Sequence, residues 1–254
     1  MKLTVLGSGT SIPHATRGSS GYWLETKSGS LMLDCSPSAI RRIAEYKLDW
    51  PNLDAIWISH FHLDHCGGLA PFLAGTKHAA GMETRAKPLR IFGPAGIRHL
   101  IEGFDAVNNY RLFKQPFPVE VIEIKELKQF EMLPGLETVT LSTPHTPESQ
   151  AIHFREDQKV FVYTSDTGFT ETLSAFAKEA ELFLTECSYL RDKPVEKHLE
   201  LAEAIHLIRR AHPSRAMLTH LYPLWDEVDF NKEVAKFSPM CEVTQAVDGL
   251  QLII

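Results

Sequence analysis

The chain has 254 residues, 44% of them hydrophobic and 23% charged, an ordinary composition for a soluble globular protein with a substantial core. Its formal net charge of −6 argues against a strongly basic nucleic-acid-binding protein. The four cysteines form no Cys-x-x-Cys pair, no apolar run reaches the ~20 residues that span a bilayer, and the N-terminal residues resemble a strand rather than a signal peptide. We therefore expect reduced thiols, no membrane contact and a cytoplasmic location.

The first half of the chain predicts short strands, glycine-containing turns and one amphipathic helix. The apolar run at residues 3–6 ends at Gly7, where a loop should begin. Residues 55–58 are all apolar, which indicates a strand buried on both faces. We expect strands at residues 3–6, 21–26, 30–34 and 54–59, and a helix at residues 36–46.

The second half has a similar order of elements. We expect strands at residues 138–142, 151–154, 160–164, 182–185 and 216–219, and helices at residues 173–180 and 199–211. Strands precede helices in both halves. We therefore predict one α/β domain over residues 1–254, built from two coarsely similar halves (roughly 1–125 and 126–254), with two sheets face to face and helices outside.

Residues 59–65, which read Ser-His-Phe-His-Leu-Asp-His, are the strongest chemical signal in the sequence. They place three imidazoles and one carboxylate directly after a predicted buried strand. In an extended backbone His60 and His62 point the same way, so both could bind one ion. A turn at residues 63–65 would direct Asp64 and His65 at a second ion. These ligand types suit borderline divalent metals such as zinc.

This segment resembles the His-x-His-x-Asp-His motif of the metallo-β-lactamase fold, a four-layer αββα sandwich, and the resemblance covers the whole chain. In that fold the later ligands follow strands in the order His, Asp, His, and each candidate here follows a predicted strand. The resemblance implies two divalent metal ions, Zn²⁺ or Mn²⁺. It assigns one ion to His60, His62 and His145, the other to Asp64, His65 and His220, and makes Asp166 the bridge.

Several segments resemble the ribonuclease Z branch of that superfamily: residues 6–10, 33–35 and 165–167, and His198, which we expect to open the helix at 199–211. In that branch a histidine at this point lies over the metals and stabilises the transition state or protonates the leaving oxygen. An imidazole with a pKa near neutrality suits this role, and a helix N-terminus favours anions. The resemblance implies that Asp64 orients the attacking water and that His198 is the proton donor.

The sequence departs from ribonuclease Z in two places. Leu199 and Glu200 follow His198, where that branch usually has Ser-Thr. Only 20 residues (146–165) separate His145 from Asp166, where bacterial ribonuclease Z carries a long tRNA-clamping arm; residues 150–162 instead predict a plain hairpin that turns at 155–158. The acidic charge also argues against a tRNA substrate. We therefore expect a phosphodiesterase for small or cyclic phosphodiesters.

Three alternative functions stay open. Thioesterases and lactonases share the same seven ligands. A tRNA 3′-processing endonuclease could carry its clamp on residues 75–88, which contain Lys77, His78, Arg85 and Lys87. A non-catalytic protein could keep the metal site for binding alone. A β-lactamase is disfavoured, because those enzymes usually supply a cysteine to the second ion and none lies beside Asp166.

A few residues near the motifs have roles that the sequence leaves open. His14 and Arg17 lie in the first loop, which borders the active site in this fold, and could contact substrate phosphate or simply face solvent. Residues 222–225, including Trp225, could cap the pocket or join a homodimer interface. A homodimer would be common for the family, but no interface is readable in the sequence.

Overall fold

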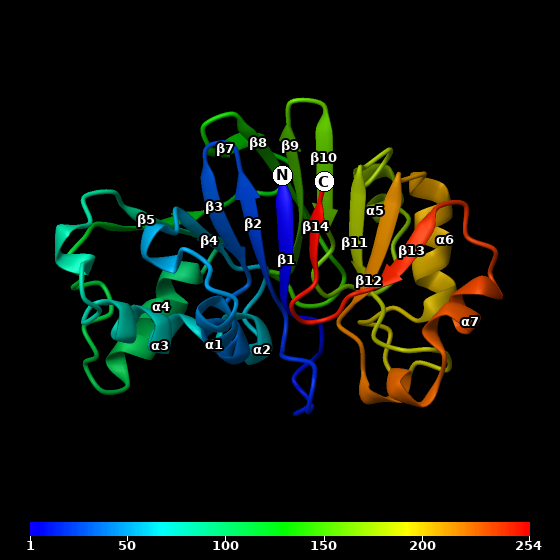
Figure 1. Ribbon diagram of the computed structural model, residues 1–254, viewed down its shortest axis with the longest axis horizontal. Helices are drawn as coiled ribbons and strands as arrows, with labels where there is room; N and C mark the ends of the chain where they lie inside the picture. The colour runs from blue at the N-terminus through cyan, green and yellow to red at the C-terminus, as the bar shows by residue number, and fades with distance from the viewer.

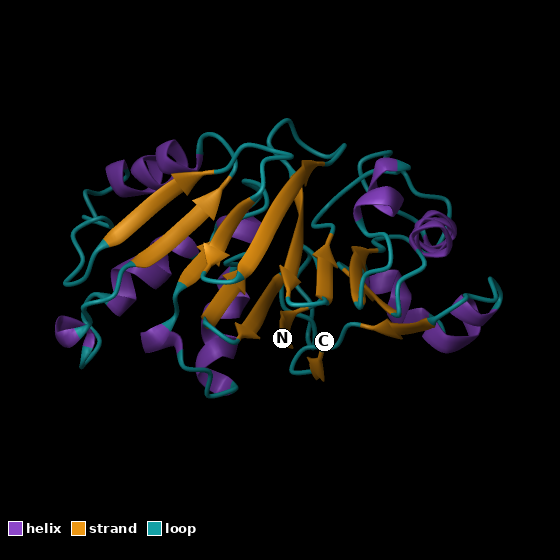
Figure 2. Cartoon of the chain, turned by 90° about the horizontal axis from the view of Figure 1, so that it is seen from above, coloured by secondary structure: helices purple, strands orange, loops and turns teal.

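In a computed structural model, which describes residues 1–254, two seven-stranded sheets lie together and helices flank them (Figures 1 and 2). The first sheet has the order β14-β1-β2-β3-β4-β5-β6 and the second has the order β13-β12-β11-β10-β9-β8-β7. The strands of the first sheet are β1 (Lys2–Gly7), β2 (Gly21–Thr26), β3 (Gly29–Leu33), β4 (Ala55–Trp57), β5 (Leu89–Gly93), β6 (Val119–Glu123) and β14 (Gln251–Ile253). Those of the second are β7 (Phe130–Leu133), β8 (Leu136–Ser142), β9 (Gln150–Glu156), β10 (Lys159–Tyr163), β11 (Leu182–Glu186), β12 (Arg215–Thr219) and β13 (Glu242–Gln245).

Both sheets are mixed in the same way. Starting at β14 or at β7, three antiparallel pairings are followed by three parallel ones. Parallel neighbours place their carboxyl ends at one edge, where loops from several strands can combine side chains into a site. In the second sheet these strands are β10, β11, β12 and β13.

The helices occupy the two outer layers of the sandwich (Figures 1 and 2). Side chains from α1, α3 and α4 pack on the outer face of the first sheet, and side chains from α5, α6 and α7 pack on that of the second. Ser36 caps α1, because its hydroxyl accepts a hydrogen bond from the Ala39 N–H. The helices are α1 (Pro37–Glu45), α2 (Leu63–Cys66), α3 (Leu69–Thr76), α4 (Ile97–Ala106), α5 (Thr172–Phe176), α6 (Leu201–Ala211) and α7 (Phe230–Ala235).

A central apolar core joins the two sheets. Leu24 and Trp57 of the first sheet pack in the same buried cluster as Phe154, Phe161 and Leu184 of the second. Burial of this apolar surface is the main force that holds the sheets together. With the outer helices, this arrangement confirms the predicted four-layer αββα sandwich.

The prediction that His198 opens the last long helix is wrong. The helix α6 begins at Leu201, and its N-cap is Glu200, which forms a capping box with Glu203. Leu199 stays outside the helix because its N–H donates to the buried Glu186 carboxylate. His198 therefore lies in a bend before the helix.

Two other sequence predictions can be compared with the structure. The helix predicted at 173–180 is shorter than expected: α5 ends at Phe176, and Glu179 has a left-handed backbone conformation (φ 55°) with its N–H bonded to the Ala211 carbonyl. The plain hairpin predicted at 150–162 is confirmed, with β9 and β10 joined by a turn at residues 157–158.

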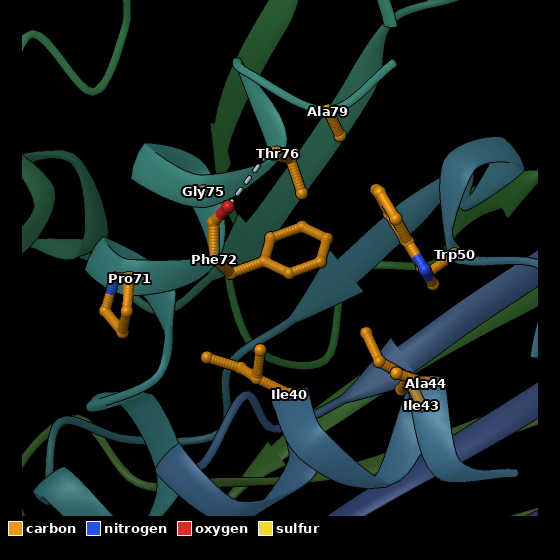
Figure 3. A pocket seen from close by; sticks show the side chains of 9 residues that line it. All are labelled: Ile40, Ile43, Ala44, Trp50, Pro71, Phe72, Gly75, Thr76 and Ala79. Atoms are coloured by element: carbon orange, nitrogen blue, oxygen red, sulfur yellow. Dashed lines mark hydrogen bonds between the residues drawn. The ribbon is translucent and has the colours of Figure 1, made fainter. Parts of the chain in front are cut away.

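The outer helices of the first sheet leave an apolar cleft of about 280 Å³ between α1 and α3 (Figure 3). Ile40 and Ile43 approach it from α1 and Phe72 from α3, with Trp50 at one side. None of the candidate site residues lines this cleft. None of the helices combines the length and the apolar character that crossing a membrane requires, and all four cysteines are free thiols.

Candidate metal centre

The candidate ligands all lie just beyond the ends of strands. Residues 60–65 follow β4 in the first sheet, and His145 follows β8 in the second. Asp166 and His220 follow β10 and β12, which lie on either side of β11 in the parallel part of the second sheet. Each sheet therefore contributes ligands from its own strand ends, as the sequence pattern predicts.

Left-handed backbone conformations turn two of these segments sharply after their strands. Ser165 has a φ of 53° and His220 a φ of 55°. Such values are uncommon for residues other than glycine and cost of order 1–2 kcal/mol each. The surrounding structure therefore has to hold Asp166 and His220 in place.

The structure brings all seven predicted ligands together. The ligand atoms of His60, His62, His145 and Asp166 lie within 4.8 Å of one another. Those of Asp64, His65 and His220 form a second group with the same spread. This division matches the one that the family resemblance implies, with one group of three histidines and one group that includes Asp64.

Asp166 lies between the two groups. Its Oδ2 is 3.8 Å from His60 Nε2 and 3.6 Å from His145 Nε2, which belong to the first group. The same oxygen is 3.3 Å from His220 Nε2, and Oδ1 is 3.2 Å from His65 Nε2. A carboxylate so placed has an oxygen facing each group, as a bridging ligand requires.

The donor atoms of this cluster fit divalent cations. His60 Nε2, His65 Nε2 and Asp166 Oδ1 are buried and form no hydrogen bond. Leaving buried polar atoms unpaired costs about 1–3 kcal/mol each. Imidazole nitrogens and carboxylate oxygens that converge in one buried cluster are the donor set that zinc or manganese prefers. The residues present therefore suit metal ions.

Burial and neighbouring charges together set the protonation of the cluster. It lowers the pKa of His60 and of His145, which favours the neutral imidazole that binds metals. For Asp64 burial acts in the opposite sense, but the hydrogen bond from His220 and the charge of His65 hold its pKa below the usual value. Asp64 is therefore a carboxylate at neutral pH, available as a ligand or as an acceptor.

Hydrogen bonds to the far side of the histidine rings fix their orientation. The Nδ1–H of His65 donates to Asp34 Oδ2 at 2.7 Å, and the Nδ1–H of His145 donates to the Lys197 carbonyl at 2.9 Å. His220 Nδ1 lies 3.0 Å from the Ser188 hydroxyl. Such contacts are typical of metal-binding histidines, because they select the tautomer and direct the other nitrogen at the ion.

His198 lies beside the cluster, as the sequence predicts. One of its ring nitrogens is within 4.8 Å of the ligand atoms of Asp166 and His220. Its ring stacks on that of His220, with centroids 5.3 Å apart. Its Nδ1–H donates to Glu186 Oε1 at 2.9 Å. Burial opposes the charged form, but Glu186 raises the pKa of His198 to about 9, so the imidazole carries a proton at neutral pH.

Glu186 is a functional candidate that the sequence analysis missed. Its side chain is fully buried and also accepts hydrogen bonds from the Thr167 N–H (2.6 Å) and the Ser188 hydroxyl (2.7 Å). The signal available was a charged residue that closes an apolar strand, next to the strands that precede Asp166 and His220. The predicted strand stopped one residue short, at Thr185.

The first-loop residues His14 and Arg17 are not in the metal cluster. His14 Nε2 and Arg17 Nη2 both lie 2.5 Å from the carboxylate of Asp226, in the segment that follows His220. They therefore tie the first loop to that segment.

Trp225 also differs from both roles that the sequence left open. It is 1% exposed, packs against Phe230 and donates its Nε1–H to the Cys187 carbonyl. Because its side chain is buried in the second outer layer, it neither caps the pocket nor faces a partner. Tyr222, in the same segment, lies next to the cluster, with its ring centroid 6.2 Å from His198 and 6.3 Å from His220.

The basic residues of the rival clamp segment bind the chain itself. Arg85 donates to the backbone carbonyls of residues 51, 53, 87 and 88. Lys77 Nζ donates to the carbonyls of residues 110 and 111, and Lys87 pairs with Asp54 at 2.8 Å. This segment is held against its neighbours rather than extended as an arm.

The sandwich and the strand-end His/Asp cluster define a metal-dependent hydrolase of the metallo-β-lactamase fold, in the branch that contains ribonuclease Z and phosphodiesterases. Within that class, the chain belongs to the family described as anti-Pycsar protein Apyc1, whose model matches residues 1–243.

Individual proteins agree with this class. The chain is 26% identical over 224 residues to the probable metallo-hydrolase YhfI of Bacillus subtilis strain 168, covering 87% of each. The crystal structure of YhfI superposes with a TM-score of 0.79 at 23% identity, over 99% of this chain and 98% of that one. Ribonuclease Z of Clostridium acetobutylicum is 22% identical over 294 aligned positions, with 93% of each covered. A diphosphatase of the PhnP family superposes with a TM-score of 0.74 at 16% identity, over 100% of this chain and 97% of that one.

Proposed function

We propose that this protein is a phosphodiesterase that hydrolyses small or cyclic phosphodiesters at a centre of two divalent metal ions. The observation that carries the proposal is the pair formed by His198 and Glu186. A protonated imidazole beside a metal cluster can protonate a departing alkoxide, which is the step that phosphate ester cleavage needs. Relatives named ribonuclease Z and a PhnP-family diphosphatase support phosphorus–oxygen bonds as the target.

The residues divide the work of hydrolysis between two sides of the cluster. When bound, divalent cations would neutralise the phosphate and lower the pKa of a water molecule. Asp64, whose Oδ2 lies 3.5 Å from His220 Nε2, would orient the attacking water and accept its proton. His198 would donate its proton to the leaving oxygen, and Glu186 would hold that imidazole in its tautomer and orientation.

The short hairpin between His145 and Asp166 supports a small substrate. The strands β9 and β10 meet in a tight turn at residues 157–158, so no arm leaves the molecule there. The alignment with the Clostridium acetobutylicum ribonuclease Z spans 294 positions, more than the 254 residues of this chain. That relative therefore carries insertions that this chain lacks.

Hydrolysis assays test the proposal. Purified protein with added zinc or manganese should cleave bis(p-nitrophenyl) phosphate and 2′,3′-cyclic nucleotides, and should leave precursor tRNA, a thioester and a lactone largely intact. His198→Ala should lower kcat about 100-fold or more while the metal content stays at the wild-type level. His99→Ala, which changes an exposed histidine of α4, should behave as wild type.

Other results would contradict the assignment. Turnover of the thioester or lactone without phosphodiester cleavage would reject the phosphodiesterase and leave the metal centre standing. Efficient maturation of precursor tRNA would show that the substrate is tRNA rather than a small phosphodiester. A His198→Ala variant with full activity would remove His198 from the mechanism.

A further inference from the structure

Two tyrosines lie in the core between the sheets, close to the metal cluster. Tyr22 belongs to β2 of the first sheet and Tyr163 to β10 of the second. Their rings meet edge to face with centroids 4.9 Å apart, and their exposed fractions are 0% and 1%. Each hydroxyl binds a residue of the opposite sheet or its loops, but the two partners differ.

The Tyr163 hydroxyl donates to Asp34 Oδ2 at 3.1 Å. Asp34 follows β3 in the first sheet, is fully buried and has a left-handed backbone conformation (φ 58°). Its Oδ2 also accepts the Nδ1–H of His65, and its Oδ1 accepts the Ser59 N–H at 2.9 Å. Tyr163 is thus the donor from the second sheet to a carboxylate that otherwise binds only residues of the first.

These contacts close a ring that passes through the metal cluster. From Tyr163 the backbone runs three residues to Asp166. Asp166 Oδ1 faces His65 Nε2 at 3.2 Å, His65 Nδ1–H binds Asp34, and Asp34 binds Tyr163 again. Half of the ring comes from each sheet. The position of Asp166 relative to His65 is therefore fixed from both sides, through the metal-facing atoms and through the tyrosine.

We propose that Tyr163 is a positioning residue of the metal centre, which sets His65 against Asp166 through Asp34 and so determines how tightly the second cation binds. The inference rests on the two-ion centre of the proposed function but not on its substrate. Without the Tyr163 hydroxyl, Asp34 Oδ2 keeps only the hydrogen bond from His65. The Asp34 carboxylate can then rotate, so the orientation of His65 is no longer fixed relative to the second sheet. Of the other group, His60 also packs against His65, with ring centroids 4.2 Å apart, whereas the far nitrogen of His145 is held by the Lys197 carbonyl outside this ring.

The neighbouring Tyr22 provides a matched control. Its hydroxyl lies 2.6 Å from Thr219 Oγ1, so it also makes a buried hydrogen bond between the sheets. Thr219, however, does not bond to the far nitrogen of any metal-facing histidine. Tyr22→Phe and Tyr163→Phe each remove one buried hydroxyl from the same pair of rings. They differ in whether the side chain of its partner is hydrogen-bonded to a metal-facing histidine: Asp34 is, whereas Thr219 precedes His220 in the chain without such a bond.

The experiment titrates metal-free wild type, Tyr163→Phe and Tyr22→Phe with Zn²⁺ in competition with a chromophoric chelator, which gives the affinity for each equivalent of zinc. Thermal unfolding of each metal-free protein gives its stability. Both variants should lose similar thermal stability. In Tyr163→Phe the second equivalent of zinc should bind about tenfold more weakly, and the affinity for the first should change much less. In Tyr22→Phe both equivalents should bind as in wild type. The visible spectrum of the Co²⁺-loaded protein should change in Tyr163→Phe alone.

Three results would overturn the inference: unchanged second-site affinity in Tyr163→Phe, an equal loss in both variants, or a wild-type protein that takes up no second ion. The last result would also reject the two-ion centre. The zinc titration needs no substrate. If the wild-type protein is inactive on phosphodiesters but the two variants still differ in zinc affinity, the role of Tyr163 is supported and only the proposed function is rejected.

Discussion

His198 owes its charge to Glu186, a residue twelve positions earlier in the chain. Because the carboxylate is buried and bound by several donors, it is a fixed partner rather than a mobile surface charge. The same carboxylate accepts hydrogen bonds from the Leu199 N–H and the Ser188 hydroxyl. Leu199 follows His198 in the chain, and the Ser188 hydroxyl lies beside His220 Nδ1. Glu186 thus determines both the orientation and the protonation of the His198 imidazole.

Replacing Glu186 should change the pH dependence of hydrolysis. Glu186 raises the pKa of His198, so Glu186→Gln should lower that pKa. As the pH rises, His198 of the variant then loses its proton at a lower pH than His198 of the wild type, and the proton donor is lost. The alkaline limb of the kcat profile should therefore move toward acid. Bound cations lower the pKa in both proteins, so the displacement between the two profiles is the quantity to measure. Glu171→Gln, which changes the partner of the exposed His206, should leave the profile in place.

At this scale the sequence allowed the ligands to be predicted but not their supports. The segment 59–65 holds four candidate donors in one local stretch, and the resemblance to the metallo-β-lactamase fold points to His145, Asp166 and His220, each of which follows a predicted strand. Glu186 and Tyr163 act through contacts between segments distant in sequence. A charged residue that closes an apolar strand marks Glu186 only weakly, and a tyrosine in a core strand such as Tyr163 has no local signature at all.

The helix α6 shows how an element places a functional residue outside itself. Its capping box closes at Glu200, where the Glu203 carboxylate accepts the Glu200 N–H at 3.0 Å. Glu203 also binds Lys193 at 2.7 Å, which ties the start of the helix to the loop before His198. The cap therefore makes the helix begin at Leu201 and leaves His198 in the bend before it, beside the metal cluster.

Removing the cap should destabilise the protein measurably. Glu203→Ala should lower the free energy of unfolding in urea by about 1 kcal/mol, because the Glu200 N–H loses its acceptor. Glu203→Gln keeps an acceptor of the same length and should lose less than half as much. An equal loss in both variants would mean that the charge pair with Lys193, rather than the cap, provides the stability.

The strands that the sequence did not reveal are mostly at the edges of the sheets. Besides the interior strand β5 and the helices α2, α3, α4 and α7, the missed elements are β6, β7, β13 and β14, which are the four edge strands. These strands are short and largely half-buried or exposed, so they lack the apolar run or clean alternation that identifies a strand. The interior strands β4, β10, β11 and β12 are fully or almost fully buried and were predicted.

For the whole molecule, the metal centre joins the two sheets. His60 and His65 come from the loop after β4 of the first sheet, whereas Asp166 and His220 come from the second. Cations bound by both would link the sheets across the core, in addition to the apolar packing between them. Their removal would leave unpaired donor atoms buried at the junction.

Metal removal should therefore lower thermal stability. A ligand that binds only the folded state, at 1,000 times its Kd, stabilises it by about 4 kcal/mol, which for a chain of this size corresponds to a fall in Tm of roughly 10 °C on removal. Calorimetry of chelator-treated protein should show this fall, and added zinc or manganese should reverse it. A Tm that does not respond to either treatment would contradict a buried centre shared by both sheets.

The division of the ligands between the sheets also has a consequence for biosynthesis. Before the sheets pack, residues 59–65 offer only a local set of donors, and Asp166 and His220 lie far away along the chain. A newly made chain can then hold at most a weakly bound ion, since a complete coordination shell does not exist until folding has brought both halves into contact. Full metal loading would therefore follow folding, and in a preparation supplied with excess metal the bound metal would report the fraction of chains whose two halves have come together.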